Sequence, residues 1–239
     1  MKRLFVLLFL IFPCIARADT LNLNWIVDGQ TYAQTTCTVG GDLTLPTAPT
    51  KYGYTFQGWE VPYSRLEYLE GQNGPYINLN YKITRDTVID VQFVSTGGSW
   101  LFGYTEGNSG RWGVAANNAT GQLTFYSYKS SITFSPTNIE EICTATFDFT
   151  NGVTVNGRFL PFSTTPGADS PETMQIFRAK NSTTNASYRI YYFSIRKAGN
   201  LIYNLVPVRR NSDGVVGLYD TLSDTLYTNA GSGTFVSEP

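Results

Sequence analysis

The amino-acid sequence predicts an all-β protein whose main body is a two-sheet antiparallel β-sandwich. Aromatic residues make up 15% of the 239 residues and charged residues only 15%. This composition, together with abundant Gly, Asn, Thr and Ser, is typical of an exported all-β protein. Many short stretches alternate apolar and polar residues, as strands with one buried face do, and no long stretch has helical spacing.

The clearest local signal is a β-hairpin within residues 145–159, whose sequence is ATFDFTNGVTVNGRF. Apolar and polar residues alternate on both sides of Asn151-Gly152. A bare two-residue loop at this dipeptide would place Phe149 opposite Thr154. The apolar residues would then change faces halfway round the hairpin, so this register is excluded.

A three-residue loop formed by residues 150–152 keeps one face of the hairpin apolar throughout. With the glycine of this loop in the left-handed conformation, the sequence predicts that Phe149 lies beside Val153. A second turn is predicted immediately afterwards at Asn156-Gly157. We therefore expect three consecutive strands in this region.

The N-terminus has the features of a signal peptide. Lys2 and Arg3 precede the nine apolar residues 4–12. The small residues Ala16 and Ala18 occupy the two positions that a signal peptidase recognises, so cleavage is predicted after Ala18. The apolar run is too short to span a bilayer, and no later segment approaches the required length, so no transmembrane segment is expected. We expect a secreted or cell-surface protein, or a periplasmic one in a Gram-negative cell.

The charge balance disfavours binding to nucleic acids. Removal of residues 1–18 takes away three of the 17 basic residues and none of the 18 acidic ones, which leaves a net charge of −4. No basic patch is available for phosphate contacts. The remaining length suits one sandwich with a small companion module.

Residues 19–62 are predicted to form that small module. The alternation in residues 21–27 and the Asp28-Gly29 turn predict a hairpin. The stretch that follows, LTLPTAPTKYGYTFQGWEV, resembles the Listeria-Bacteroides repeat, also called the internalin B repeat, of bacterial surface proteins. The residues that match the repeat are Pro46, Pro49, Gly53, Tyr54, Phe56, Gly58 and Trp59. The resemblance implies a small β-grasp-like unit.

Residues 63–239 are predicted to form the sandwich. The opening stretch RLEYLEGQNGPYINLNYKITRDTVIDVQFVSTGGSWLFGYTEG, the hairpin, and the closing stretch NLVPVRRNSDGVVGLYDTLSDTLYTNAGSGTF occur in fixed order. Together they resemble the concanavalin-A-like and laminin-G-like lectin domains of bacterial and phage proteins. This resemblance implies a jelly-roll β-sandwich. Asn156 stands where those domains often carry Asp.

The expected function is carbohydrate binding or adhesion without catalysis. A chain without histidine cannot build Ser-His-Asp or Cys-His catalysis. The E-x-D-x-x-E strand of the relatives of this fold that hydrolyse glycans is also missing. The alternative is a structural or protein-protein interaction module of the bacterial cell surface. The expected partner is therefore a glycan or a cell-surface protein.

The candidate ligand site lies on and after the strand that carries Trp112. A stacked Trp112 ring flanked by Arg111, Asn117 and Asn118 could hold a sugar. The alternative is that Trp112 belongs to the core, because it alternates with Val114. Both alternatives remain open on the sequence.

Cysteine usage allows a disulfide between the two predicted domains. After removal of the signal peptide, Cys37 and Cys143 remain, one in each domain, and an oxidising compartment permits their pairing. Two buried free thiols are the alternative.

No cofactor or resident metal is expected. Calcium stays open, because Asp148 could bind it together with Asp213 or Asp220. The alternative for these aspartates is a local role in turns.

Overall fold

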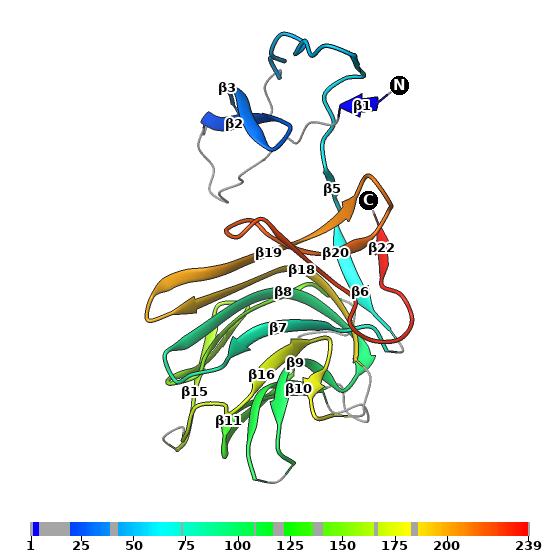
Figure 1. The fold of residues 1–239 in the computed structure, drawn as a ribbon. Helices are drawn as coiled ribbons and strands as arrows, with labels where there is room; N and C mark the ends of the chain where they lie inside the picture. The colour runs from blue at the N-terminus through cyan, green and yellow to red at the C-terminus, as the bar shows by residue number, and fades with distance from the viewer. Residues whose placement is uncertain are drawn as a thin grey trace. The chain divides into compact units, whose positions relative to one another are not determined.

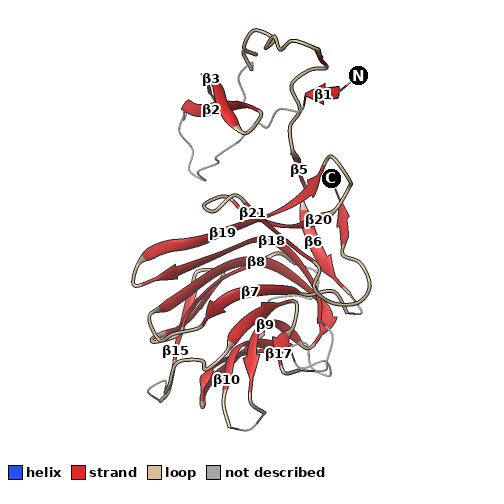
Figure 2. Cartoon of the chain, viewed as in Figure 1, coloured by secondary structure: helices blue, strands red, loops and turns tan. Residues whose placement is uncertain are grey.

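The all-β prediction is confirmed by the computed structural model, in which strands and loops occur and no helix is found among the described residues (Figure 2). Within that part of the chain, no helix is long and apolar enough to cross a membrane. Contacts divide the chain into residues 1–64 with 210–214, and residues 65–209 with 215–239. The structure describes residues 2–4, 20–38, 43–72, 74–107, 109–116, 122–135, 141–164, 167–182 and 186–238.

The first unit contains an antiparallel hairpin and a short parallel pair of strands. Strands β2 (Thr20–Val27) and β3 (Gln30–Thr38) form the hairpin. The residues of its Asp28-Gly29 turn have φ values of 51° and 79°, as the predicted turn requires. Strand β1 (Lys2–Leu4) pairs in parallel with β4 (Tyr54–Phe56). Because β1 belongs to the expected signal peptide, cleavage would remove this pairing.

A small aromatic core explains part of the repeat-like sequence pattern. Leu23 and Trp25 are buried, and Trp59 packs against them. The rings of Trp25 and Trp59 meet edge to face with centroids 4.9 Å apart. The indole nitrogen of Trp59 donates a hydrogen bond of 3.2 Å to the carbonyl oxygen of Pro46. The pattern therefore places a proline and a tryptophan that contact one another directly.

The turn at residues 210–214 belongs to the first unit, whereas the sequence placed it in the sandwich. Asn211 joins this turn to residues 61–64 of the first unit through both its backbone and its side chain. Its backbone N–H donates to Pro62 O (2.8 Å), and its side-chain amide donates to Val61 O (2.7 Å). Its side-chain oxygen accepts a bond of 2.7 Å from the Ser64 hydroxyl.

The second unit contains two packed antiparallel sheets, seen as layers in Figure 1. The main order of the seven-stranded sheet is β12 (Ser130–Phe134), β11 (Leu123–Tyr128), β10 (Arg111–Ala116), β9 (Trp100–Thr105), β16 (Thr173–Ile176), β7 (Ile77–Lys82). The seventh strand, β17 (Ala179–Lys180), pairs in parallel with β9. Strand β12 is therefore the last strand on one side of this smaller sheet.

The larger sheet has eleven strands, and β15 is the last strand on one side. Its main order is β15 (Arg158–Pro161), β14 (Gly152–Val155), β13 (Cys143–Asp148), β8 (Thr87–Gly98), β18 (Ala186–Lys197), β19 (Asn200–Arg210), β20 (Val216–Asp220), β21 (Thr225–Thr228). The remaining strands are β5 (Tyr63–Arg65), which pairs with β19, and β6 (Tyr68–Gly71), which pairs with β18 and with β22 (Val236–Glu238).

The core of the sandwich is a cluster of aromatic rings between the two sheets. Phe147 on β13 packs against Phe125 on β11, with ring centroids 5.1 Å apart. It also packs against Phe102 on β9, at 5.5 Å. All three side chains are fully buried. Burial of a large apolar side chain contributes roughly 1.5–3 kcal/mol, so this cluster is a major source of stability.

The predicted register of the β13–β14 hairpin is wrong by two residues. Phe147, not Phe149, lies opposite Val153, and the loop consists of residues 149–151. The cause is the Asp148 carboxylate. One of its oxygens accepts the backbone N–H groups of the second and third loop residues, each at 2.9 Å, so the strand ends one residue earlier than predicted.

Gly152 begins the return strand and has a positive φ, as the sequence predicts. Its φ is 144°, and a Cβ atom there would lie 2.2 Å from the carbonyl oxygen of Leu160 on β15. The glycine is therefore required by the close approach of the neighbouring strand. The second turn is as predicted, because Asn156 and Gly157 have φ values of 47° and 82° and join β14 to β15 as a two-residue loop.

Cys37 and Cys143, the two cysteines among the described residues, are free thiols in the structure and lie in different units. Cys143 is 2% exposed within the sandwich core, and burial raises the pKa of its thiol to about 11. Cys37 is half-buried on β3. The pairing of Cys37 with Cys143 therefore stays a prediction.

Alkylation of the folded chain at about pH 8, without reductant, is expected to label Cys37 before Cys143. The thiolate is the reactive form, and the raised pKa makes the thiolate scarce at Cys143. Burial also shields this thiol from the reagent. Peptide mass spectrometry before and after unfolding in guanidinium measures the two sites. If neither cysteine is labelled in the unfolded chain until reductant is added, the two are joined in a disulfide.

Candidate functional site

The structure places Trp112 in the core, which overturns its prediction as a ligand-stacking residue. The side chain is 2% exposed. Its ring packs between Tyr104 and Tyr128, with centroid distances of 5.6 and 5.4 Å. Its indole nitrogen donates a hydrogen bond of 2.8 Å to Ala168 O. No face of the ring is left for a sugar.

Arg111 does not share a site with Trp112, because consecutive residues of a strand point to opposite faces of the sheet. Its Nε donates to Gly107 O at 3.0 Å, and one terminal nitrogen donates to the Tyr126 hydroxyl at 3.3 Å. The guanidinium also lies 5.2 Å from the centre of the Tyr126 ring. Asn117 and Asn118, the other predicted ligand residues, lie outside the described residues.

The three aspartates considered for calcium each stabilise their own turn. Asp148 closes the β13–β14 loop, as described above. Asp213 forms a two-bond pair with Arg210, at 2.9 and 2.7 Å. Asp220 accepts the Ser223 hydroxyl at 2.6 Å and the Asn204 backbone N–H at 2.9 Å. In the described ranges, no group of three His, Cys, Asp or Glu side chains could hold a metal.

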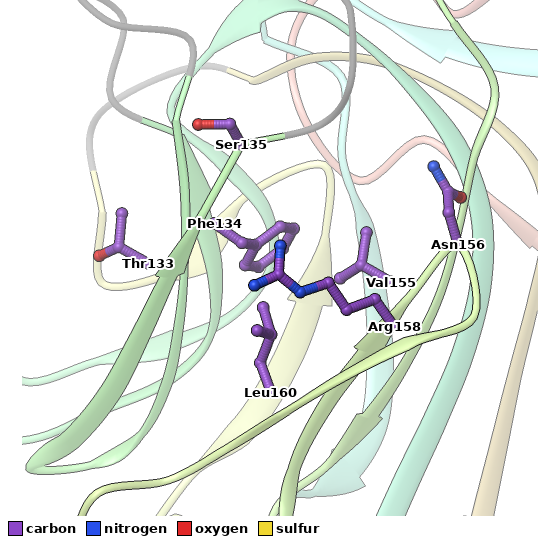
Figure 3. A pocket seen from close by; sticks show the side chains of 7 residues that line it. All are labelled: Thr133, Phe134, Ser135, Val155, Asn156, Arg158 and Leu160. Atoms are coloured by element: carbon purple, nitrogen blue, oxygen red, sulfur yellow. The ribbon is translucent and has the colours of Figure 1, made fainter.

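A pocket of about 450 Å³ opens at one lateral edge of the sandwich and is shown in Figure 3. It lies between β12, at the end of the smaller sheet, and the β14–β15 hairpin, at the end of the larger sheet. Its volume falls in the range of about 300–1,000 Å³ that is usual for ligand pockets. We call it the edge pocket; its lining residues are Thr133, Phe134, Ser135, Val155, Asn156, Arg158 and Leu160.

The floor of the edge pocket is apolar and continuous with the sandwich core. Phe134 is 6% exposed, and its ring packs against Phe147 at 6.3 Å. Val155 is 9% exposed and Leu160 is half-buried against the same core. A ligand in the pocket would therefore contact hydrophobic groups that the fold already holds in place.

The rim of the edge pocket is polar, and Arg158 is its main charged group. Arg158 is exposed, and Figure 3 shows its side chain extending from β15 toward Phe134. The Asn156 side-chain oxygen accepts the Thr144 backbone N–H at 2.9 Å, which holds this amide in position. Thr133 shares a hydrogen bond of 3.2 Å with Thr124.

The edge pocket could not be predicted from local sequence patterns, because its walls come from two different sheets. One feature of the sequence nevertheless indicated it. Arg158 precedes Leu160 by two residues on one strand, so it shares a face with an apolar residue that packs on the core. A charged residue on the inward face of a strand is unusual, and it marks a position where the core is open to solvent.

Comparison of the chain with protein-family models and with curated proteins finds no match. The resemblances to the Listeria-Bacteroides repeat and to lectin-like domains therefore stay interpretations of the sequence. The geometry of the edge pocket stands independently of them.

Replacement of Trp112 by Ala is expected to lower the free energy of unfolding by about 3–5 kcal/mol, because it empties a large volume in the core. Trp112→Phe should cost less, since it keeps a ring between Tyr104 and Tyr128 and loses the bond to Ala168. Denaturant unfolding of both variants measures the difference. A Trp112→Ala variant with the wild-type midpoint would show that the ring does not support the core.

Proposed function

We propose that this chain is an exported carbohydrate-binding, adhesive protein without catalytic activity, and that the glycan binds in the edge pocket. The observation that carries this proposal is the amphipathic lining of the pocket. A sugar ring has an apolar C–H face and a rim of hydroxyl groups. The apolar floor of Phe134, Val155 and Leu160 and the polar rim match these two parts.

The predicted signal peptide and the resemblance to lectin-like domains support the same proposal. Both are features of exported proteins, for which the glycans of cell surfaces are available ligands. The β-sandwich provides a rigid frame at whose edge a few polar groups are held ready. The location and the ligand class are therefore mutually consistent.

The affinity of a single pocket should be low. The site is open to solvent, and each polar contact contributes about 1 kcal/mol. We expect micromolar or weaker binding by one copy. Stable adhesion would then require several copies that bind a surface together, which raises the effective affinity without new contacts.

The alternative is a protein-protein interaction module, and one observation favours it. Half of the ten large hydrophobic residues that are exposed in the described chain belong to the first unit. They are Tyr32, Leu43, Leu45, Tyr52 and Val61, and Tyr52 is fully exposed. A high share of exposed apolar residues on a small module is a feature of proteins that contact other proteins.

A glycan array probed with the exported full-length chain is expected to show binding that Ser135→Trp abolishes. Ser135 is exposed at the pocket mouth, so a bulky ring there fills the pocket without disturbing the core. Ser131→Trp is the matched control, because Ser131 is an exposed residue of β12, the strand that ends just before Ser135, and it does not line the pocket. Equal binding by the two variants would place the glycan elsewhere.

Adhesion to cells separates the two functions if the array shows no binding. Periodate oxidation of the target cells destroys glycans and leaves surface proteins in place, whereas protease treatment removes proteins. Adhesion that survives periodate and is lost after protease would support the protein-protein alternative and contradict the glycan proposal.

A further inference from the structure

We propose that the edge pocket selects sugars that carry a carboxylate, and that Arg158 binds the carboxylate. This inference rests on the proposed function and adds the chemical class of the ligand.

Most of the hydrogen-bonding groups that remain available on the rim are donors. Arg158 offers five N–H donors and no acceptor. The Asn156 oxygen is already engaged by the Thr144 N–H, which leaves its two amide N–H groups for a ligand. The Ser135 hydroxyl can donate as well as accept. The rim therefore offers more donors than acceptors, and most of the donors belong to Arg158.

No carboxylate occurs among the seven residues that line the pocket. This matters because each hydroxyl of a neutral sugar both donates and accepts, and a rim of mixed donors and acceptors recognises it best. A carboxylate only accepts hydrogen bonds. A donor-rich rim without acidic residues is therefore better matched to a sugar with a carboxylate than to a neutral one.

The Arg158 side chain is not committed to another group of the described chain. In those residues it has neither an ion pair nor a side-chain hydrogen bond, whereas Arg189 pairs with Glu70 at 2.9 Å and Arg196 with Asp90 at 2.7 Å. A planar guanidinium with five donors binds a carboxylate through two parallel hydrogen bonds. Arg158 is thus available for this geometry at the pocket mouth.

The apolar floor strengthens the interaction with a carboxylate. The methylene groups of an arginine can lie on apolar surface while its charged end stays in water. Phe134 and Leu160 form this surface below Arg158 (Figure 3). A sugar ring on the same floor would exclude water from one side of the ion pair, and an ion pair is stronger where water is excluded.

The attraction between Arg158 and a carboxylate acts only at short range, because the chain as a whole carries a net negative charge. The net charge of −4 after removal of the signal peptide does not steer an acidic ligand from a distance. Exposed charges are screened over about 8 Å at physiological ionic strength, so the contact with Arg158 should weaken as salt rises. A neutral sugar bound in the same pocket should show little dependence on salt.

The test compares oligogalacturonate with its carboxyl-reduced form, which is neutral and has the same linkages. Calorimetric titration of the exported full-length chain should show about tenfold or greater preference for the acidic form, as a charged hydrogen-bonded contact provides. Arg158→Gln should remove the preference and Arg158→Lys should retain part of it. Arg85→Gln is the matched control, because Arg85 is exposed and lies outside the pocket lining.

The outcomes distinguish this inference from the proposed function. Equal binding of the acidic and neutral forms by the wild-type chain would overturn the carboxylate inference and leave glycan binding intact. Tighter binding of a sulfated oligosaccharide than of the uronate would also overturn it. The absence of binding to any saccharide on the array or in titration would overturn the proposed function itself.

A second measurement keeps the inference testable if the Arg158 variants fail to fold. In the wild-type chain, the side-chain Nε–H resonance of Arg158 should shift on titration with galacturonic acid. It should shift little with galactose at the same concentration. Identical responses to the two monosaccharides would contradict a role for Arg158 in binding the carboxylate.

Discussion

The packing of Phe147 against Phe125 across the two sheets is the contact on which the rest of the sandwich depends. Phe147 belongs to the larger sheet and Phe125 to the smaller one, and both side chains are fully buried. Side chains alternate between the faces of a strand, so a shift of β13 by one residue would turn Asp148 toward the core in place of Phe147. The cost of burying that carboxylate fixes the register of β13.

The register of β13 in turn positions the edge pocket. Asp148 closes the loop into β14, and the Asn156-Gly157 turn brings β15 back beside β14. Both turn residues have positive φ, so the chain reverses within two residues and Arg158 comes to lie opposite Val155. The guanidinium reaches the pocket because the whole hairpin is held by the aromatic contact at its start.

Strands and tight turns of this fold could be predicted from the sequence, and strand registers could not. The Asp28-Gly29 and Asn156-Gly157 turns were predictable because their need for positive φ is a local property. The β13–β14 register depends on a side-chain carboxylate that ends the strand, and on Leu160 approaching Gly152 from β15. The first is a local side-chain contact and the second is a tertiary contact, and the alternation of apolar and polar residues specifies neither of them.

The location of the candidate site could not be predicted from the sequence either, because it depends on which strands the fold brings together. The alternation of Trp112 with Val114 was sufficient to favour the core, but the meeting of β12 and β15 is a property of the sheet order. Arg158 shows why the site lies at an edge. Deep between the sheets, an unpaired guanidinium on an inward face would be very costly. At the lateral edge its charge stays in water while its stem covers Phe134 and Leu160, so the position that tolerates the charge is also the one a ligand can enter.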